Sequence, residues 1–219
     1  MLPAALGAGA RLERVLAIGC HADDIEIGCG GTLLTVAAQN PGLDVGWLVL
    51  SASGEREREA RMSATAFLSG LQRSPRLMFD GFRDGFFPYL GGEVKDRFER
   101  LKDEVEPQVI FTHLGTDLHQ DHRLVSELTW NTFRDHLILE YEIPKYDADL
   151  GSPNLYVPLS EEMARRKVDL LLEHYPSQRA KHWFSGDVFH GLMRIRGMEA
   201  NSPTRLAEAF RCRKLVLTP

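Results

Sequence analysis

The sequence predicts an α/β protein with a Rossmann-like, mostly parallel and doubly wound sheet that carries helices on both faces. Two observations support this fold class. Residues 14–20 and 45–52 are short and almost continuously apolar, as strands buried on both faces of a parallel sheet are. Segments with the apolar spacing of helices lie between such strands, and this alternation continues through residues 14–144.

The first strand, helix and strand form one βαβ unit. The strand at residues 14–20 is followed by the helix-forming segment GGTLLTVAAQNPG, in which Asn-Pro-Gly at residues 40–42 is a stop signal. The strand at residues 45–52 comes next. A second helix then begins at Ser53, whose side chain suits an N-cap, and ends at Gly70.

The same alternation continues through the middle of the chain. The segment PRLMF predicts a third strand, and GGEVKDRFERLKDEVEP predicts an amphipathic helix that Pro107 ends. The apolar segment QVIFTH at residues 108–113 predicts a fourth strand. After it, QDHRLVSELTWNTFRDH predicts a helix and LILEYEIP predicts a fifth strand.

Beyond the fifth strand the alternation weakens. The segment SEEMARRKVDLLLEHY predicts an amphipathic helix that Ser160 caps. From Ser177 onward, short apolar runs mix with glycines and predict no particular element. Because 219 residues suit one well-buried core, we expect a single domain over residues 1–219, with a Rossmann-like core at 14–144 and a C-terminal extension at 145–219 that packs on it.

Composition and charge narrow the class of partner. The chain is 43% hydrophobic and 26% charged, which is typical of a soluble globular protein. Its formal charge of -5 and pI near 5.9 argue against nucleic acid as the main partner, because phosphate binding draws on a basic excess. We therefore expect a small-molecule substrate.

The cysteines and the N-terminal segment indicate the cellular compartment of the protein. Three scattered cysteines are too few for a disulfide framework, so we expect a reducing compartment and a cytoplasmic enzyme. Residues 1–14 lack the basic region of a signal peptide and are expected to be a loose leader. No apolar run approaches the roughly 20 residues that span a bilayer, so no membrane anchor is expected. The sequence leaves open whether the chain forms a homo-oligomer.

Two clusters of polar side chains follow apolar strands. The segment HADDIEIGCGG comes directly after the first strand, and THLGTDLHQDHRLV follows the strand at residues 108–113. In open α/β sheets, ligands bind beyond the carboxyl ends of the strands, where the strand order reverses. Alone, the first cluster fits a surface turn and the second a solvated loop. Together, at one rim of one sheet, they predict a metal site.

A hydrolytic zinc site uses three nitrogen or oxygen ligands from the protein and keeps one position for water. His21 and Asp24 from the first cluster and His122 from the second supply such a set. The same two histidines and one carboxylate would also suit Fe²⁺. Asp23, next to a ligand, is a candidate general base, and His119 is a candidate for stabilising an oxyanion or protonating the leaving group.

The motifs HADDIEIGCGGTL and TDLHQDHRLV together resemble the LmbE-like, or PIG-L, family of zinc-dependent N-acetylglucosamine de-N-acetylases. The resemblance implies a Rossmann-like fold and removal of acetyl groups from amino sugars. In the family motif H-P-D-D, the matching positions imply that His21 is a ligand, Asp23 the base and Asp24 a second ligand. Ala22 stands where the family usually has proline, which loosens the loop but removes no functional group.

The later family motif H-x-D-H implies roles for the second cluster. By this resemblance His119 is the oxyanion-binding or acid histidine, and His122 is the third ligand. Asp121, between them, would orient a histidine from behind, as partners of metal ligands commonly do.

The resemblance also implies substrate contacts. Family members place a substrate-binding arginine after the second strand, which falls on Arg56 or Arg58, with Arg61 as a third candidate. For at least two of the three, a solvated helix face with i,i+4 ion pairs is the better explanation. Asp84 lies where the family has an aspartate that contacts sugar hydroxyls, and a simple turn aspartate before Gly85 is the alternative.

Other residues near the motifs have open interpretations. Phe86, Phe87 and Tyr89 would form an apolar sugar platform or belong to the core. His113 would support the metal site or be a core histidine, and Glu26 would anchor its loop or be solvated.

The cysteines and glycines of the first motif have structural interpretations. Cys20 and Cys29 are expected to be small buried residues rather than thiolate ligands. Gly28, Gly30 and Gly31 are expected to let a helix pack tightly behind the site.

These observations favour a metal-dependent hydrolase that removes an N-acetyl group from an amino-sugar conjugate of the N-acetylglucosamine type. A metal-dependent amide or ester hydrolase on a non-sugar substrate is the first alternative. A non-catalytic binding protein of the same fold is the second, and the intact base and ligands argue against it. The sequence does not identify the sugar or its aglycone.

Overall fold

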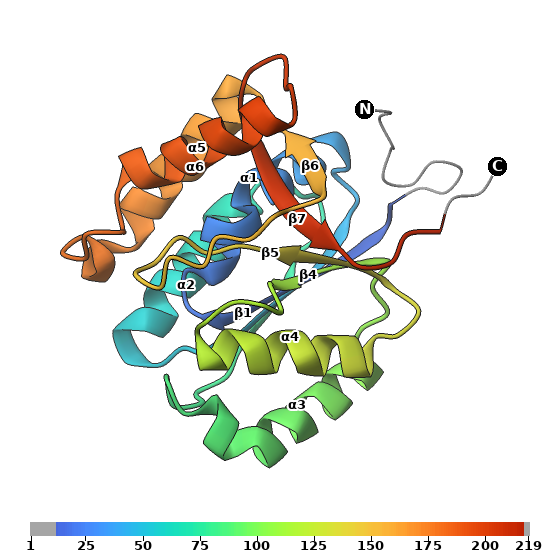
Figure 1. Cartoon of the computed structure of the whole chain (residues 1–219). Helices are drawn as coiled ribbons and strands as arrows, with labels where there is room; N and C mark the ends of the chain where they lie inside the picture. Colours follow the sequence, from blue (N-terminus) through green and yellow to red (C-terminus); the bar gives the residue numbers. More distant parts are fainter. Residues whose placement is uncertain (1–11, 217–219) are drawn as a thin grey trace.

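The computed structural model describes residues 12–216 of the chain, and most of the expected leader, residues 1–11, lies outside them. The described residues form seven strands, six α-helices and two short 3₁₀ helices (Figure 1). In chain order these elements are β1 Arg14–His21, α1 Asp24–Gln39, β2 Asp44–Ser51, α2 Gly54–Phe67, β3 Arg76–Phe79, η1 Phe87–Leu90, α3 Gly91–Glu104, β4 Val109–His113, α4 Gln120–Thr132, β5 Leu137–Tyr141, β6 Leu155–Pro158, α5 Glu161–His174, η2 Pro176–Gln178, α6 Gly186–Glu199 and β7 Ala207–Cys212.

The strands form one sheet in the order β3-β2-β1-β4-β5-β7-β6. The first five strands in this order are parallel to one another, and β7 pairs antiparallel with both β5 and β6. The chain order reverses between β1 and β4, which are neighbours in the sheet although almost a hundred residues separate them. This confirms the predicted fold class and places the reversal point at the two strands that carry the polar clusters.

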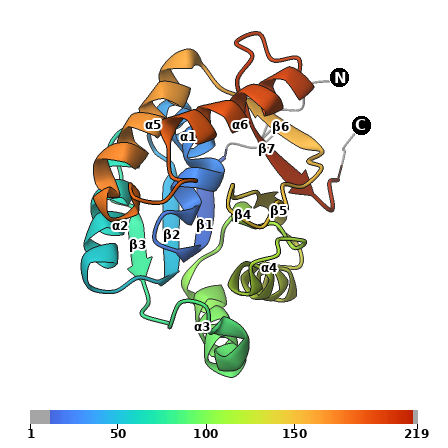
Figure 2. The same ribbon diagram turned by 60° about the vertical axis from the view of Figure 1, so that its left-hand side comes forward.

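Helices cover both faces of the sheet (Figure 2). Val15 and Ala17 of β1 pack into the core cluster that includes residues of α1, α2, α5 and α6. Leu16 and Ile18, which point to the other face, pack with residues of α3 and α4. Because successive residues of a strand point to opposite faces, a strand covered on both sides must be apolar throughout, and this is why β1 has no polar alternation.

The C-terminal part of the chain contributes to the same sheet and to one of its faces. Helix α5 matches its prediction, and the Ser160 hydroxyl accepts a hydrogen bond from the Met163 amide at 3.1 Å. Strands β6 and β7 and helix α6 had no counterpart in the sequence prediction. The shared sheet supports our proposal of a single domain. None of the helices within residues 12–216 is long and apolar enough to cross a membrane.

The glycines of α1 allow the close packing that the sequence predicted. A Cβ atom on Gly28 would lie 2.2 Å from the Tyr141 ring, and one on Gly30 would lie 2.7 Å from the Phe67 ring. A Cβ atom on Gly31 would lie 2.6 Å from Leu159. Helix α1 therefore rests directly on the sheet and on the neighbouring side chains, and its N-terminus is fixed at the end of β1.

Buried polar contacts tie the C-terminal region to α1. The Lys167 ammonium donates to the Ile27 carbonyl and to the Glu208 carboxylate, both at 2.6 Å. The same carboxylate accepts from the amides of Gly31 at 2.8 Å and Thr32 at 2.6 Å. This ion pair is almost completely buried, so each charge depends on the other for compensation.

Glu26, in the first turn of α1, is a buried carboxyl group rather than a solvated one. Its side chain is fully buried and accepts a hydrogen bond from the Tyr175 hydroxyl at 2.5 Å. Burial raises the pKa of Glu26 to about 8, because the charged form loses its hydration inside the protein. Glu26 therefore stays largely neutral near pH 7 and anchors the N-terminal turn of α1 to the residue that follows α5.

The Gly28→Ala substitution tests the packing of α1. The added methyl group meets the buried Tyr141 ring, so we expect the free energy of unfolding to fall by about 1–3 kcal/mol. Urea denaturation measures this change. The matched control is Gly92→Ala in α3, where nothing lies within 4 Å of the added Cβ, and where stability should stay the same or rise. Equal stability of the two variants would contradict the close packing.

The Glu26→Gln substitution tests the buried carboxyl group in metal-free protein. The unfolded chain releases the Glu26 proton near its usual pKa of about 4.3, whereas the folded chain keeps it up to about pH 8. Between these values Glu26 makes folding less favourable as the pH rises. Glutamine stays neutral, so the variant should gain stability relative to wild type between about pH 5 and about pH 8 in urea denaturation. A pH-independent difference would show that Glu26 is ionised when folded.

Candidate metal centre and active site

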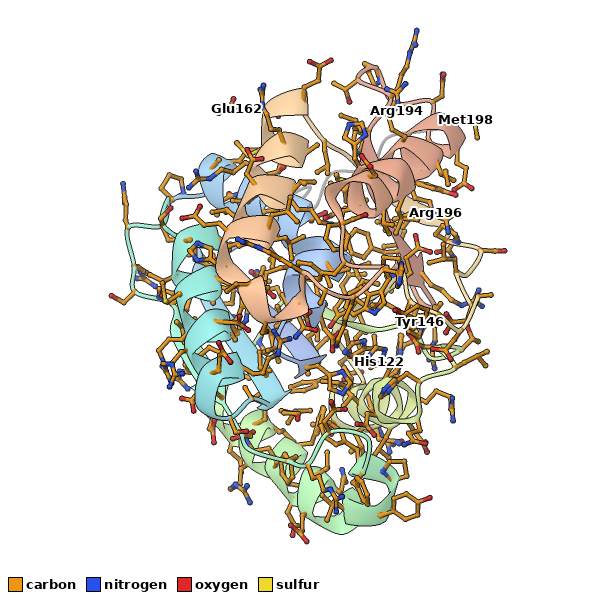
Figure 3. All side chains as sticks on the ribbon, turned by 90° about the vertical axis from the view of Figure 1, so that its left-hand side faces the viewer. His122, Tyr146, Glu162, Arg194, Arg196 and Met198 are labelled. Atoms are coloured by element: carbon orange, nitrogen blue, oxygen red, sulfur yellow. The ribbon has the colours of Figure 1, made fainter. Side chains whose placement is uncertain are left out.

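The candidate site lies at the carboxyl ends of the neighbouring strands β1 and β4. Strand β1 ends at His21, and α1 begins at Asp24 with Asp23 as its N-cap residue. Helix α4 begins after the loop that follows β4, with His119 as its N-cap residue and His122 in its first turn (Figure 3). The two predicted clusters therefore meet at one rim of the sheet.

Three ligand atoms from these clusters form a compact triangle. The distance from His21 Nδ1 to Asp24 Oδ2 is 3.3 Å, and that from His21 Nδ1 to His122 Nε2 is 3.2 Å. Asp24 Oδ2 lies 3.5 Å from His122 Nε2. In a tetrahedral zinc site with bonds of about 2.0–2.1 Å, two ligand atoms are about 3.3 Å apart. The donor set and its spacing therefore fit a divalent metal ion.

The charges of the triangle suit a cation. Burial alone would raise the pKa of Asp24, but the nearby His122, His113 and His21 rings lower it well below its usual value. Burial lowers the pKa of His122 to about 4, with His113 adding to the effect. Burial also lowers that of His21, yet the Asp24 carboxylate raises it well above normal. A cation in the triangle would replace the proton that Asp24 favours on His21.

Asp117 orients the ring of His122. Its Oδ2 atom lies 2.9 Å from His122 Nδ1, so the ring donates from Nδ1 and turns the Nε2 lone pair towards the triangle. The Lys145 ammonium lies 3.0 Å from the same oxygen, and the His119 amide donates to Asp117 Oδ1 at 2.7 Å. Sequence reasoning assigned no role to Asp117 or Lys145. Asp117 lies within the second motif, but its contact with His122, five residues later, depends on the conformation of the loop between them.

Asp84 and Asp121 lie on the other side of the His21 ring. His21 Nε2 is 3.0 Å from Asp84 Oδ1 and 3.4 Å from Asp121 Oδ2. The buried Asp121 carboxylate also accepts from the amides of Gly85 at 2.7 Å and Phe87 at 3.1 Å, which fastens the loop after β3 to α4. The Asp84 side chain is 74% exposed, so it lies at the mouth of the site and contacts both His21 and solvent.

Asp23 is buried beside the triangle with one oxygen held and one without a protein partner. Arg56 donates from Nη2 to Asp23 Oδ1 at 2.9 Å, while Oδ2 has no hydrogen-bond partner among the described residues. Burial raises the pKa of Asp23, although the Arg56 charge opposes this effect. The unpaired oxygen is therefore more basic than an ordinary aspartate oxygen and is available to accept a proton.

His119 presents a proton donor to the same place. Its Nδ1 atom accepts a hydrogen bond from the Asp121 amide at 3.3 Å, so the neutral ring carries its proton on Nε2. The His119 ring centroid lies 4.9 Å from that of His21 and 4.6 Å from that of His122. Burial and the His21 charge lower the pKa of His119. A neutral Nε2–H group next to the triangle suits hydrogen bonding to a developing oxyanion.

A second group of possible ligand atoms overlaps with the triangle and includes Cys20 and His113. His113 Nε2 accepts from the Cys20 amide at 2.9 Å and lies 3.2 Å from Asp24 Oδ2. Both residues are fully buried, and burial raises the pKa of the Cys20 thiol well above its usual value. This group shares Asp24 and His122 with the triangle but has two fully buried side chains in place of the partly exposed His21, so it lies deeper in the core.

The candidate arginines and aromatic residues differ in how they lie relative to the candidate site. Arg56 contacts Asp23, whereas Arg61 pairs with Glu57 at 2.8 Å on the surface of α2. Arg58 is exposed, and no contact links it with the other site residues in the described part of the chain. Phe87 is fully buried, while Phe86 and Tyr89 are exposed. The structure therefore brings one of the three arginines to the site and excludes Phe87 from a solvent-facing platform.

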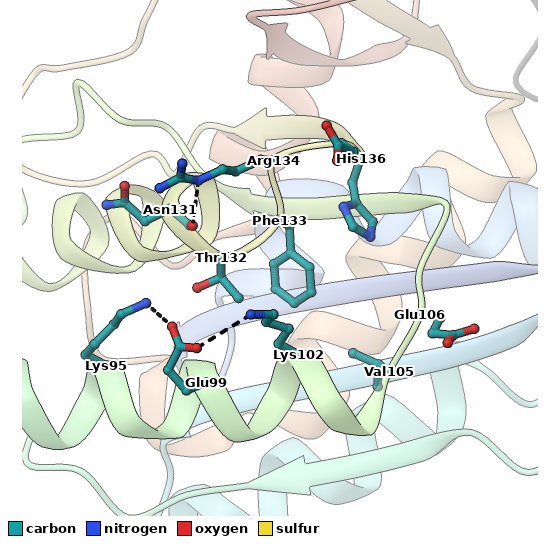
Figure 4. A pocket seen from close by; sticks show the side chains of 11 residues that line it. Lys95, Glu99, Lys102, Val105, Glu106, Asn131, Thr132, Phe133, Arg134 and His136 are labelled. Atoms are coloured by element: carbon teal, nitrogen blue, oxygen red, sulfur yellow. Dashed lines mark hydrogen bonds and ion pairs between the residues drawn. The ribbon is translucent and has the colours of Figure 1, made fainter.

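A hollow of the surface lies away from these residues, between the C-terminal ends of α3 and α4 (Figure 4). This open hollow has a volume of about 760 Å³ and is lined by charged side chains of both signs together with Phe133. None of the residues that line it belongs to the polar clusters, so it is separate from the candidate site.

Comparisons with known proteins agree with this arrangement. Residues 16–133 match the family model PIG-L, described as GlcNAc-PI de-N-acetylase. The chain is 26% identical over 187 residues to the uncharacterized deacetylase YaiS of Escherichia coli, covering 78% of this chain and 95% of that protein.

Solved structures share the fold at lower identity. The N,N′-diacetylchitobiose deacetylase of Pyrococcus horikoshii is 20% identical with a TM-score of 0.68, covering 92% of this chain and 84% of its own. GalB, the 4-carboxy-2-hydroxymuconate hydratase of Pseudomonas putida, is 15% identical with a TM-score of 0.74, covering 95% of this chain and 99% of its own. The fold thus carries more than one reaction. With a family model matching more than half of its length, the chain belongs to the PIG-L family of deacetylases.

Proposed function

We propose that this protein is a zinc-dependent hydrolase that removes the N-acetyl group from an amino-sugar conjugate of the N-acetylglucosamine type. One observation carries the proposal. A triangle of ligand atoms from His21, Asp24 and His122 lies beside Asp23, whose Oδ2 has no protein partner. The description of the matched family and the deacetylase name of the E. coli relative support the same reaction.

His21, Asp24 and His122 would hold the metal ion. When bound, the ion would polarise the acetyl carbonyl and lower the pKa of a coordinated water to about 7. Two histidines and one carboxylate would serve Fe²⁺ as well as Zn²⁺. Asp117 contacts the outer nitrogen of His122, and Asp84 and Asp121 contact that of His21. These three carboxylates would fix the orientation of the two rings.

Asp23 would act as the general base. Its free Oδ2 atom accepts a proton from the attacking water, while the bond from Arg56 keeps Oδ1 in place. Because burial raises its pKa, the carboxylate binds this proton more firmly than an exposed aspartate would. The same proton can then pass to the departing amine nitrogen, which leaves the site protonated.

His119 would stabilise the negative charge that develops on the acetyl oxygen. The bond from the Asp121 amide to Nδ1 fixes the tautomer with the proton on Nε2, so the donor is in place before the reaction begins. Asp121 would act through this amide and through its carboxylate, which contacts His21 and holds the loop after β3. Asp84, exposed at the mouth of the site, and Arg58, exposed on α2, remain our candidates for contacts with sugar hydroxyls.

We further propose a cytoplasmic location. All three cysteines are free, and two of them, Cys20 and Cys29, are buried, which suits a protein that never meets an oxidising compartment.

The alternative to the proposed reaction is hydrolysis of a non-sugar amide or ester at the same site.

Acetate release with the metal measured on the same sample tests the proposal. The substrates are N-acetylglucosamine, N,N′-diacetylchitobiose, N-acetylglucosaminyl-phosphatidylinositol and a simple acetylated amine. We expect acetate from at least one sugar and about one metal ion per chain. Asp23→Ala should keep the metal and lose about 10²–10⁴-fold in turnover, because the base alone contributes that much. The exposed control Asp103→Ala should match wild type.

Three results would contradict the proposal in different ways. Metal-loaded protein that hydrolyses only the simple amide would favour the non-sugar reaction. Protein that binds no divalent metal would remove the metal centre altogether. Full turnover by Asp23→Ala would remove Asp23 from the role of base.

A further inference from the structure

The base Asp23 is connected to a distant part of the chain by a continuous series of hydrogen bonds. The series runs through Arg56 and Glu59 of α2 to Ser177 in the 3₁₀ helix η2. We propose that Ser177 and Glu59 are positioning residues, which hold Asp23 in its reactive orientation through Arg56. This inference rests on the proposed function and assigns a role to the region after residue 176, where the sequence indicated none.

Arg56 bridges two buried carboxylates. Its Nη2 atom donates to Asp23 Oδ1 at 2.9 Å, and its Nη1 atom donates to Glu59 Oε2 at 2.8 Å. The planar guanidinium group presents donors in a fixed geometry, so both carboxylates are held at defined angles. Both of these contacts lie within the protein. We therefore assign Arg56 a positioning role, whereas the family resemblance left Arg56, Arg58 and Arg61 open as the substrate-binding arginine.

Ser177 fixes Glu59, and with it the guanidinium group. The Ser177 amide donates to Glu59 Oε1 at 2.9 Å, and the Ser177 hydroxyl donates to Glu59 Oε2 at 2.6 Å. The Arg56 Nη1 atom also lies 3.2 Å from the Ser177 hydroxyl oxygen. Gln178 donates to that hydroxyl at 3.0 Å. With both oxygens of Glu59 satisfied, the carboxylate cannot rotate and carry Arg56 away from Asp23.

The same turn holds the backbone on the other side of Asp23. The Tyr175 hydroxyl oxygen lies within hydrogen-bond distance of the carbonyl of Ala22, the residue directly before Asp23, and of the Glu26 carboxyl group in the first turn of α1. The Arg56 guanidinium carbon lies 5.2 Å from the centroid of the Tyr175 ring. The segment 175–178 thus fixes both the main chain that carries the base and the side chain that orients it.

This arrangement explains why only one oxygen of Asp23 is free. Arg56 holds Oδ1, and Oδ2 has no hydrogen-bond partner among the described residues. A base that must reach a water molecule depends on such orientation, and a misplacement of about 1 Å can cost about 10²-fold in rate. Loss of the Ser177 contacts would let the guanidinium and then the carboxylate turn, without removing any group that touches substrate.

The kinetic test uses three substitutions, with N,N′-diacetylchitobiose as the probe. Ser177→Ala and Glu59→Gln should lower kcat about tenfold, and Arg56→Lys about 100-fold, because lysine cannot bridge two carboxylates. KM should stay within about twofold and the metal content should be unchanged, since substrate and metal contacts remain. Ser177→Thr, which keeps the hydroxyl, should restore most of kcat. Matched controls are Ser69→Ala and Glu55→Gln on exposed positions of the α2 region.

A second measurement does not need turnover. In metal-free protein, NMR of the arginine side chains should show resolved, slowly exchanging Nη signals for Arg56, because two carboxylates restrict its rotation. Ser177→Ala should average these signals, whereas Ser69→Ala should not. This NMR measurement tests the hydrogen-bond series even if the wild-type protein releases no acetate. Absence of acetate release would count against the proposed function alone.

The results of these experiments distinguish a positioning role of Arg56 from a role in substrate binding. A raised KM with unchanged kcat in Arg56→Lys would identify Arg56 as a substrate contact and overturn the inference. So would wild-type kcat in both Ser177→Ala and Glu59→Gln, or averaged Arg56 signals in the wild-type protein. A kcat loss that Ser177→Thr restores, together with the loss of the Arg56 signals in Ser177→Ala, would support it.

Discussion

The parallel pairing of β1 with β4 is the constraint on which the candidate site depends. It brings the segment after His21 and the segment after His113 to one edge of the sheet, although these residues are far apart in the chain. Each strand is followed by a helix that begins with polar residues, so the two helix N-termini bring the proposed ligands, base and acid to the same edge of the sheet. A fold with a different strand order would separate the same residues and leave no metal triangle.

The rest of the structure keeps these two helix starts in place. On the α1 side, glycines let the helix lie against Tyr141 and Phe67, and the buried Lys167–Glu208 pair fastens its middle. On the α4 side, Asp121 holds the loop after β3. The C-terminal region, which looked peripheral in the sequence, therefore supports the centre directly. The neighbouring hydratase structure shows that this fold alone does not select a reaction, so the arrangement of side chains must.

The core of the fold and the triangle could be predicted because both have local signals. Continuous apolar runs mark β1, β2 and β4, and the histidines and aspartates lie directly after two of them. Strand β7 has no such signal, because Glu208 interrupts its apolar residues and finds its partners, Lys167 of α5 and two backbone amides of α1, far away in the sequence. Helix α6 carries Gly197, which would weaken a prediction, yet its missing Cβ leaves room for the backbone at Arg205.

The residues that support the site could not be predicted, because they have no such local signal. Asp117, Lys145, Glu59 and Ser177 gain their roles only from partners that tertiary packing brings to them. Two of the three arginines after β2 were expected to lie on a solvated face, but which one turns inward depends on the position of Asp23.

The location of the bound metal tests the account most directly. Crystals of metal-loaded protein, measured at the absorption edge of the metal, give an anomalous difference map that marks the ion independently of any assumed ligand. The account predicts one peak at about 2.0–2.2 Å from His21 Nδ1, Asp24 Oδ2 and His122 Nε2, on the side of Asp23. A peak bound instead by Cys20 and His113, or no peak at this edge of the sheet, would contradict it.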